Sequence, residues 1–98
     1  MSGMSEMLTD YVESTIKKLV DEPEEVKVET NISTKAVIVQ IKTSQEDVGK
    51  IIGKHGRTVD ALKIVCLAIK NTHFPDDPKR VLIEVLEDEN SDFVYKNK

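Results

Sequence analysis

The spacing of apolar residues divides the first half of the chain into one helical and two extended segments. In residues 5–21 the apolar positions recur every three or four residues, which predicts an amphipathic helix that Pro23 ends. Residues 25–32 and 36–43 instead alternate apolar and polar positions, as half-buried strands do. The short connection between them predicts an antiparallel hairpin.

The second half of the chain predicts two helices followed by a third strand. A capping-box sequence from Ser44 to Asp47 opens a short helix over residues 44–52, and a longer helix follows over residues 57–72. Residues 80–87 alternate again and predict a strand. The order α-β-β-α-α-β predicts a two-layer α+β domain, in which three helices cover one face of a three-stranded sheet.

A chain of 98 residues has room for one domain, which we place at residues 1–87. The remaining residues, 88–98, are acidic and polar, and we expect them to form a flexible tail. No apolar run is long enough to span a bilayer and no secretory leader is apparent, so a cytoplasmic location is expected.

The longer helix carries more apolar residues than packing on a sheet requires. Its apolar positions cover more than half of the helical circumference, and the excess falls at Ala61, Ile64 and Ala68. These residues either pack against the first helix or form a dimer interface with a partner subunit. The pattern alone leaves both interpretations open.

Nothing in the sequence has the spacing of a catalytic or metal site. Cys66 lies in an apolar run and is expected to be buried, and His55 and His73 show no ligand spacing with it. We therefore expect no cofactor, no metal and no enzymatic activity.

Charge is distributed unevenly along an acidic chain. The net charge is −4, but residues 44–72 hold five bases against three acids. Four of these bases lie within fourteen residues around a pair of glycines: Lys50, Lys54, Arg57 and Lys63. A local basic site on an acidic body attracts phosphate while limiting non-specific binding, so a modest affinity is expected.

The glycine pair itself, Gly53 and Gly56, separates the two predicted helices. Glycine tolerates positive φ and lets another backbone approach closely, and the amides that begin the next helix favour an anion. A Walker nucleotide-binding loop needs four residues between its glycines and Ser or Thr after Gly-Lys. Gly49 and Gly53 are separated by three residues and His55 follows Lys54, so this class is excluded.

The run from Ile51 to Val59, with Gly-Lys-His-Gly between apolar residues at helical spacing, resembles the signature of the KH domain. The order of the predicted elements resembles the type II, bacterial arrangement, and the small size resembles the KhpA family of bacterial RNA-binding proteins. The resemblance implies single-stranded RNA binding, as a chaperone or post-transcriptional regulator. It also implies a homodimer, or a heterodimer with a larger KH-containing protein.

The resemblance also implies which residues hold the RNA. The loop would hold the sugar-phosphate backbone, basic residues would supply charge, and an apolar floor would support the bases. The residues expected to take part are Gly53, Lys54, His55, Gly56, Arg57, Lys50, Gly49, Val48 and Ile52.

A second interpretation makes this a protein–protein interaction module or a ribosome-assembly module with incidental RNA contact. The apolar excess on the long helix and the acidic body favour it. The intact glycine loop favours RNA.

Overall fold

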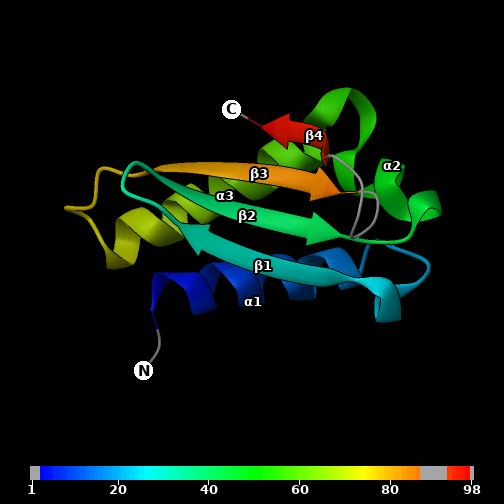
Figure 1. Ribbon diagram of the computed structural model, residues 1–98, viewed down its shortest axis with the longest axis horizontal. Coiled ribbons are helices and arrows are strands. Elements are labelled where there is room, and N and C mark those ends of the chain that lie inside the picture. Colours follow the sequence, from blue (N-terminus) through cyan, green and yellow to red (C-terminus); the bar gives the residue numbers. More distant parts are fainter. Residues whose placement is uncertain (1–2, 87–92, 98) are drawn as a thin grey trace.

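Helices and a mixed sheet form two layers in the computed structural model, which describes residues 3–86 and 93–97. Three α-helices and four strands follow in the order α1, β1, β2, α2, α3, β3 and β4 (Figure 1). Their bounds are α1 Met4–Lys17, β1 Lys27–Ile32, β2 Ala36–Lys42, α2 Val48–Ile52, α3 Arg57–His73, β3 Arg80–Leu86 and β4 Phe93–Asn97. Single turns of 3-10 helix, η1 Pro23–Glu25, η2 Gln45–Asp47 and η3 Lys54–Gly56, lie in the connections.

The sheet has the strand order β1-β2-β3-β4. Strands β1 and β2 form the expected antiparallel hairpin, β2 and β3 are parallel, and β4 is antiparallel to β3. The predicted α+β class with the type II order is therefore confirmed. The fourth strand was not predicted, because it lies in the segment expected to be a tail; residues 88–92 and 98 of that segment fall outside the described residues.

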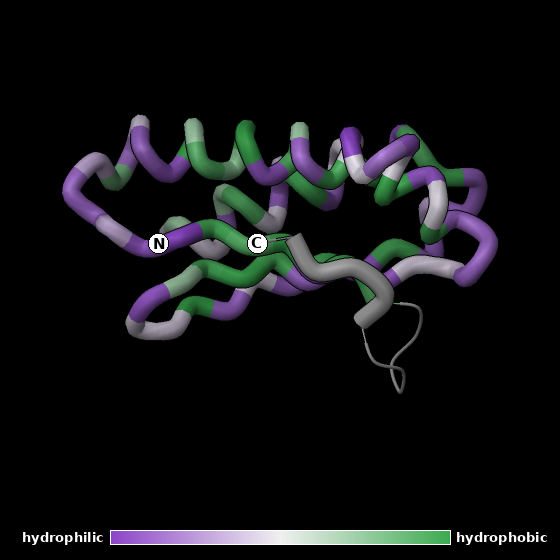
Figure 2. The backbone as a smooth tube through the Cα atoms, turned by 90° about the horizontal axis from the view of Figure 1, so that it is seen from above, coloured by the Kyte–Doolittle hydropathy of each residue, from purple (hydrophilic) through white to green (hydrophobic). Residues whose placement is uncertain are grey.

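The helices gather on one side of the sheet (Figure 2), and buried apolar residues from both layers form one core. Alternation buries every second residue of β2, as predicted, whereas β3 buries Glu84 as well as Val81, Ile83 and Val85. The core residues from the sheet are Val37, Val39, Ile41, Val81, Ile83 and Val85, and those from α1 are Met4, Leu8, Val12 and Ile16. Thr9 of α1 and Thr30 of β1 share a hydrogen bond of 2.7 Å, which ties this helix to the edge of the hairpin.

Helix α3 buries one stripe of residues against the sheet and exposes the other side. Val59, Leu62 and Cys66 are buried as expected, and burial raises the pKa of the Cys66 thiol to about 12. Lys70 continues this stripe and is buried although it is charged. Its ammonium group donates to the carbonyl of Asp77, which lets the aliphatic stem cover the core.

The apolar excess on α3 does not pack against the first helix. Ala61, Ile64 and Ala68 are all exposed, and the side chain of Ile64 keeps 66% of its surface accessible. That interpretation is therefore wrong for these residues, because the helices meet along the buried stripe of α3.

Asp47 joins α2 to the connection between α1 and β1. Its buried carboxylate accepts hydrogen bonds from the amides of Asp21 and Glu22, at 3.2 and 3.0 Å, and from the hydroxyl of Ser44 at 3.2 Å. The predicted capping box is therefore wrong, since Asp47 caps another segment instead of its own helix. The same contact explains why α1 ends at Lys17, before the residues that we expected to remain helical.

Burial alone would raise the pKa of the Asp47 carboxyl. The two amides, the Ser44 hydroxyl and the Lys50 ammonium lower it by more, so its pKa lies below the ordinary value. A carboxyl with a lowered pKa in the folded state stabilises the protein above its unfolded pKa of about 3.9. That contribution is lost as the pH falls through this value toward the folded pKa.

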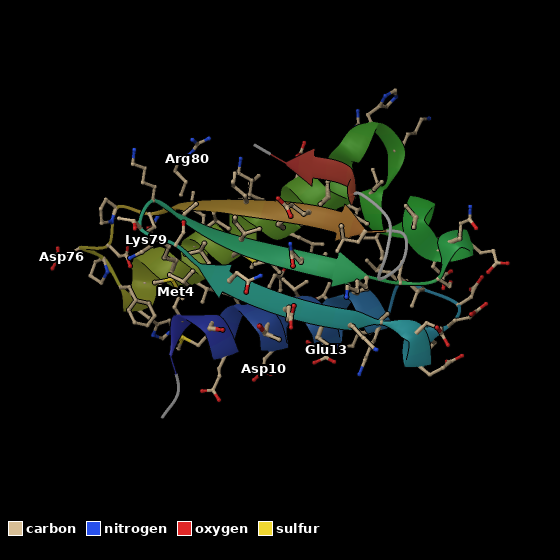
Figure 3. The ribbon with its side chains drawn as sticks, viewed as in Figure 1. Met4, Asp10, Glu13, Asp76, Lys79 and Arg80 are labelled. Atoms are coloured by element: carbon tan, nitrogen blue, oxygen red, sulfur yellow. The ribbon has the colours of Figure 1, made fainter. Side chains whose placement is uncertain are left out.

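We predict that Asp47→Asn lowers the melting temperature at pH 7 by several degrees, because one carboxylate oxygen becomes an amide donor facing other donors. The difference from the wild type should shrink as the pH is lowered through 4. Asp10→Asn is the matched control, since Asp10 is exposed on α1 and points away from the body (Figure 3). Thermal melts followed by circular dichroism measure both; equal melting temperatures for Asp47→Asn and the wild type would contradict this role.

Candidate nucleic-acid interface

The connection between α2 and α3 is a tight loop with an unusual backbone. Gly53 has φ 77° and ψ 172°, His55 has φ 58° and Gly56 has φ 73°. The amide of Gly53 donates to the carbonyl of Gly49 at 2.9 Å, and the amide of Gly56 donates to the carbonyl of Gly53 at 3.1 Å. The first bond ends α2 and the second closes the loop, so α3 begins directly at Arg57.

Gly53 has no room for a side chain. A Cβ atom there would lie 2.3 Å from Oγ1 of Thr58 and 2.9 Å from its backbone nitrogen. Its φ and ψ also fall in a region that only glycine occupies readily. The bare backbone of Gly53 is therefore a requirement of the loop itself.

Gly49 differs from Gly53 in this respect. Nothing in the described part of the chain lies within 4 Å of the Cβ position at Gly49, and the residue is exposed within α2. No neighbouring segment of the protein therefore accounts for this glycine, and its α2 surface is open to a ligand.

Three polar side chains of the loop face solvent. Lys54, His55 and Arg57 are all exposed, and nitrogen-tipped side chains project outward from the connection between α2 and α3 (Figure 3). Lys54 and Arg57 carry full positive charges, and the left-handed backbone at His55 turns the chain between them. The predicted basic residues of the loop thus lie together at one end of the molecule.

Lys50 lies in a different electrostatic setting. Its ammonium group is 3.2 Å from a carboxylate oxygen of Asp21 and 3.4 Å from one of Asp47. Hydrogen bonds to these two carboxylates raise the pKa of Lys50. Its charge is balanced locally, so it adds less positive potential than Lys54 and Arg57 do.

Acidic residues lie on the same side as Lys50. Burial raises the pKa of the Glu22 carboxyl, and the charges of Glu46 and Asp47 raise it further. Repulsion of this kind marks a negative region beside α2, which disfavours phosphate there.

An apolar surface adjoins the loop on α2. Ile51 is fully buried, whereas Val48 and Ile52 are half-buried and pack against the core from its margin. The two residues expected to form a floor for bases therefore keep part of their surface accessible. Helix α2 also packs against β3.

Sequence reasoning missed three features of the site. Asp47 was expected to cap its own helix, although a carboxylate beside Lys50 can equally accept hydrogen bonds from the amides of a distant segment. The left-handed conformation of His55 had no signal beyond its position between two glycines. The pairing of β4 with β3 had a weak signal, the run of aromatic and β-branched residues Phe93, Val94 and Tyr95.

Two chemical features bear on other classes of function. Within residues 3–86 and 93–97, no three His, Cys, Asp or Glu residues are grouped as ligands for a metal ion. In the same residues no helix combines the length and the apolar character needed to cross a bilayer.

Comparison with known proteins places the chain among KH domains. The family model described as "KhpA/KhpB, KH domain" matches residues 9–85. The RNA-binding protein KhpA of Clostridium perfringens is 37% identical over 81 residues, covering 81% of this chain and 100% of that protein. No solved structure matches.

Two further relatives agree. The RNA-binding protein KhpA of Aquifex aeolicus is 38% identical over 80 residues, covering 82% of this chain and 96% of that protein. The RNA-binding protein KhpA of Chlamydia caviae is 33% identical over 81 residues, covering 83% of this chain and 99% of that protein.

We predict that Gly53→Ala destabilises the protein by about 1–3 kcal/mol, from backbone strain and from displacement of Thr58. Gly49→Ala is the matched control: it should stabilise α2 by up to about 1 kcal/mol, because alanine favours the helix and meets no neighbour. Urea unfolding followed by circular dichroism compares the two. Equal stabilities would mean that the loop accepts a side chain at Gly53.

Proposed function

The chain belongs to the KhpA/KhpB family of KH domains, and from this premise we propose that it binds single-stranded RNA through the Gly53–Gly56 loop. The observation that carries the proposal is the bare, positive-φ backbone of this loop with exposed Lys54, His55 and Arg57 around it. Relatives at 33% to 38% identity are named RNA-binding proteins, which supports the same ligand.

In the proposed mechanism the loop holds the sugar-phosphate backbone. A KH loop of this kind clamps about four nucleotides of single strand. The tight turn that Gly53 permits presents the exposed Lys54–His55 segment to the RNA, while Lys54 and Arg57 attract its phosphates. His55 can donate a hydrogen bond and adds charge when it is protonated.

The charges around α2 determine the path that we propose for the RNA strand. Lys50 is held by Asp21 and Asp47, and further carboxylates lie beyond them, so phosphates are repelled on that side. The bases then lie toward Val48 and Ile52, with Gly49 allowing close approach. No Phe, Tyr or Trp lies between Val48 and Val59, so the segment lacks the large aromatic rings on which bases stack most strongly, and sequence preference should be low.

We infer an RNA chaperone or a post-transcriptional regulator from this weak, permissive mode of binding. Catalysis forms no part of the proposal, and the raised pKa of Cys66 makes its thiol a poor nucleophile. No cofactor is required. A cytoplasmic location belongs to the same proposal, because the protein would encounter single-stranded RNA in the cytoplasm.

A second candidate, a protein interaction or ribosome-assembly module, is favoured by the exposed face of α3. Ile64 is 66% exposed, and Val65 and Leu67 are each 38% exposed. An apolar side chain as open as Ile64 at the centre of a long helix suits contact with another protein. This contact is compatible with RNA binding, because the loop lies at the N-terminal end of the helix.

We propose that a second copy of the chain occupies this face, or the related face of a larger KH-containing protein. Ala61, Ile64 and Ala68 form one stripe at spacings of three and four residues. In an antiparallel pair of α3 helices around a two-fold axis, Ile64 meets Ile64 and Ala61 faces Ala68. The small residues allow close approach, and the contact is self-complementary.

We predict that Lys54→Asp/His55→Asp weakens binding to a short single-stranded RNA by at least about tenfold, because the loop then repels phosphate. Thr34→Asp/Lys35→Asp is the matched control. It changes the net charge equally, in the exposed turn between β1 and β2 at the opposite end of the sheet (Figure 1). Fluorescence anisotropy measures the affinity, after circular dichroism has verified that each variant is folded. An equal loss of RNA affinity in both variants would mean that net charge alone causes it.

We predict that Ile64→Asp gives a folded monomer, because an unpaired carboxylate would be buried at the contact. Leu19→Asp is the control, since Leu19 is an exposed apolar residue outside α3. Sedimentation equilibrium measures the mass of each. A wild type that is monomeric at high concentration, or an Ile64→Asp protein that remains dimeric, rules out this interface.

A further inference from the structure

Strand β3 would expose a free edge beside the glycine loop if β4 were absent. Helices α2 and α3, which flank the loop, both pack against β3. An edge strand presents a row of unpaired backbone amides and carbonyls. These are the groups that can hydrogen-bond the edges of unstacked bases.

Strand β4 pairs with this edge. Its residues run antiparallel to β3, with Tyr95 opposite Val85 and Asn97 opposite Ile83. It also contacts α3, the helix that follows the glycine loop. The match to the KH family ends at residue 85, so the strand that covers the edge lies beyond the matched domain.

We propose that β4 is an autoinhibitory strand, which covers the β3 edge beside the Gly53–Gly56 loop and competes with single-stranded RNA for it. This inference rests on the proposed function. RNA held at the loop would extend its bases over Val48 and Ile52 toward β3, and there it would meet backbone groups that β4 already occupies.

The pairing is suited to reversible release. Strand β4 has five residues, pairs on one side only, and has a register irregularity between Val85 and Leu86. Short segments at a sheet edge open locally at a small fraction of the cost of global unfolding. If the edge is free one-tenth of the time, the apparent affinity for RNA is about tenfold weaker than that of the open form.

The test replaces two adjacent residues of the strand in the full-length protein, Val94→Pro/Tyr95→Pro. Alternate residues of a strand direct their amides to opposite sides, so one of the two prolines removes a donor to β3 whichever register holds. The change leaves the net charge at −4, so electrostatics cannot produce the effect. Val94→Ile/Tyr95→Phe is the matched control, because it keeps the amides and the strand-forming character.

The proposal predicts that the proline variant binds a short single-stranded RNA several-fold more tightly than the wild type and the control. Adding Lys54→Asp/His55→Asp to it should abolish the gain. Equal affinities of folded wild type and proline variant overturn the inference and leave the proposed function intact. A gain that survives the loop substitutions also overturns it, and a lack of RNA binding by every variant overturns both.

Hydrogen exchange on the wild type gives an answer that does not depend on the variant folding. Addition of the RNA should increase amide exchange in residues 93–97, because the strand is displaced. Unchanged or slower exchange there, at saturating RNA, overturns the competition.

Discussion

The structure depends on one steric constraint, the lack of space for a side chain at Gly53. The backbone leaves α2 with φ 77° and ψ 172° and passes Thr58 so closely that a Cβ atom would overlap it. This reversal aims α3 back across the sheet and leaves the loop peptide bare at the end of the molecule. The same feature therefore positions a core helix and creates the surface that we assign to RNA.

The surroundings of the loop restrain its charge. Asp47 holds the α1–β1 connection against α2, and it draws Lys50 into a cluster of carboxylates with Asp21. At the loop itself, positive potential therefore rests mainly on Lys54 and Arg57. An acidic body with such a small basic site is suited to brief contact with many single strands, and a dimer through α3 would place two sites on one particle.

Local periodicity predicted most of the fold and the position of the loop. Alternation in β2 and β3 and the stripe on α1 follow from burial on one face, and the glycine pair marks the break between the helices. The sequence could not predict contacts between distant segments. Asp47 accepts hydrogen bonds from residues more than twenty positions away. Lys70 is buried because its ammonium group donates to a loop carbonyl, and β4 forms because it pairs with the edge of β3.

The most direct test of the account is a map of amide chemical shifts as an unlabelled oligouridine is added to the isotopically labelled protein. The largest changes should fall between Gly49 and Thr58, centred on the Gly53–Gly56 loop, and little change should occur in the turn between β1 and β2. Shifts confined to the exposed face of α3, with the loop unaffected, would contradict the assignment of this loop to RNA.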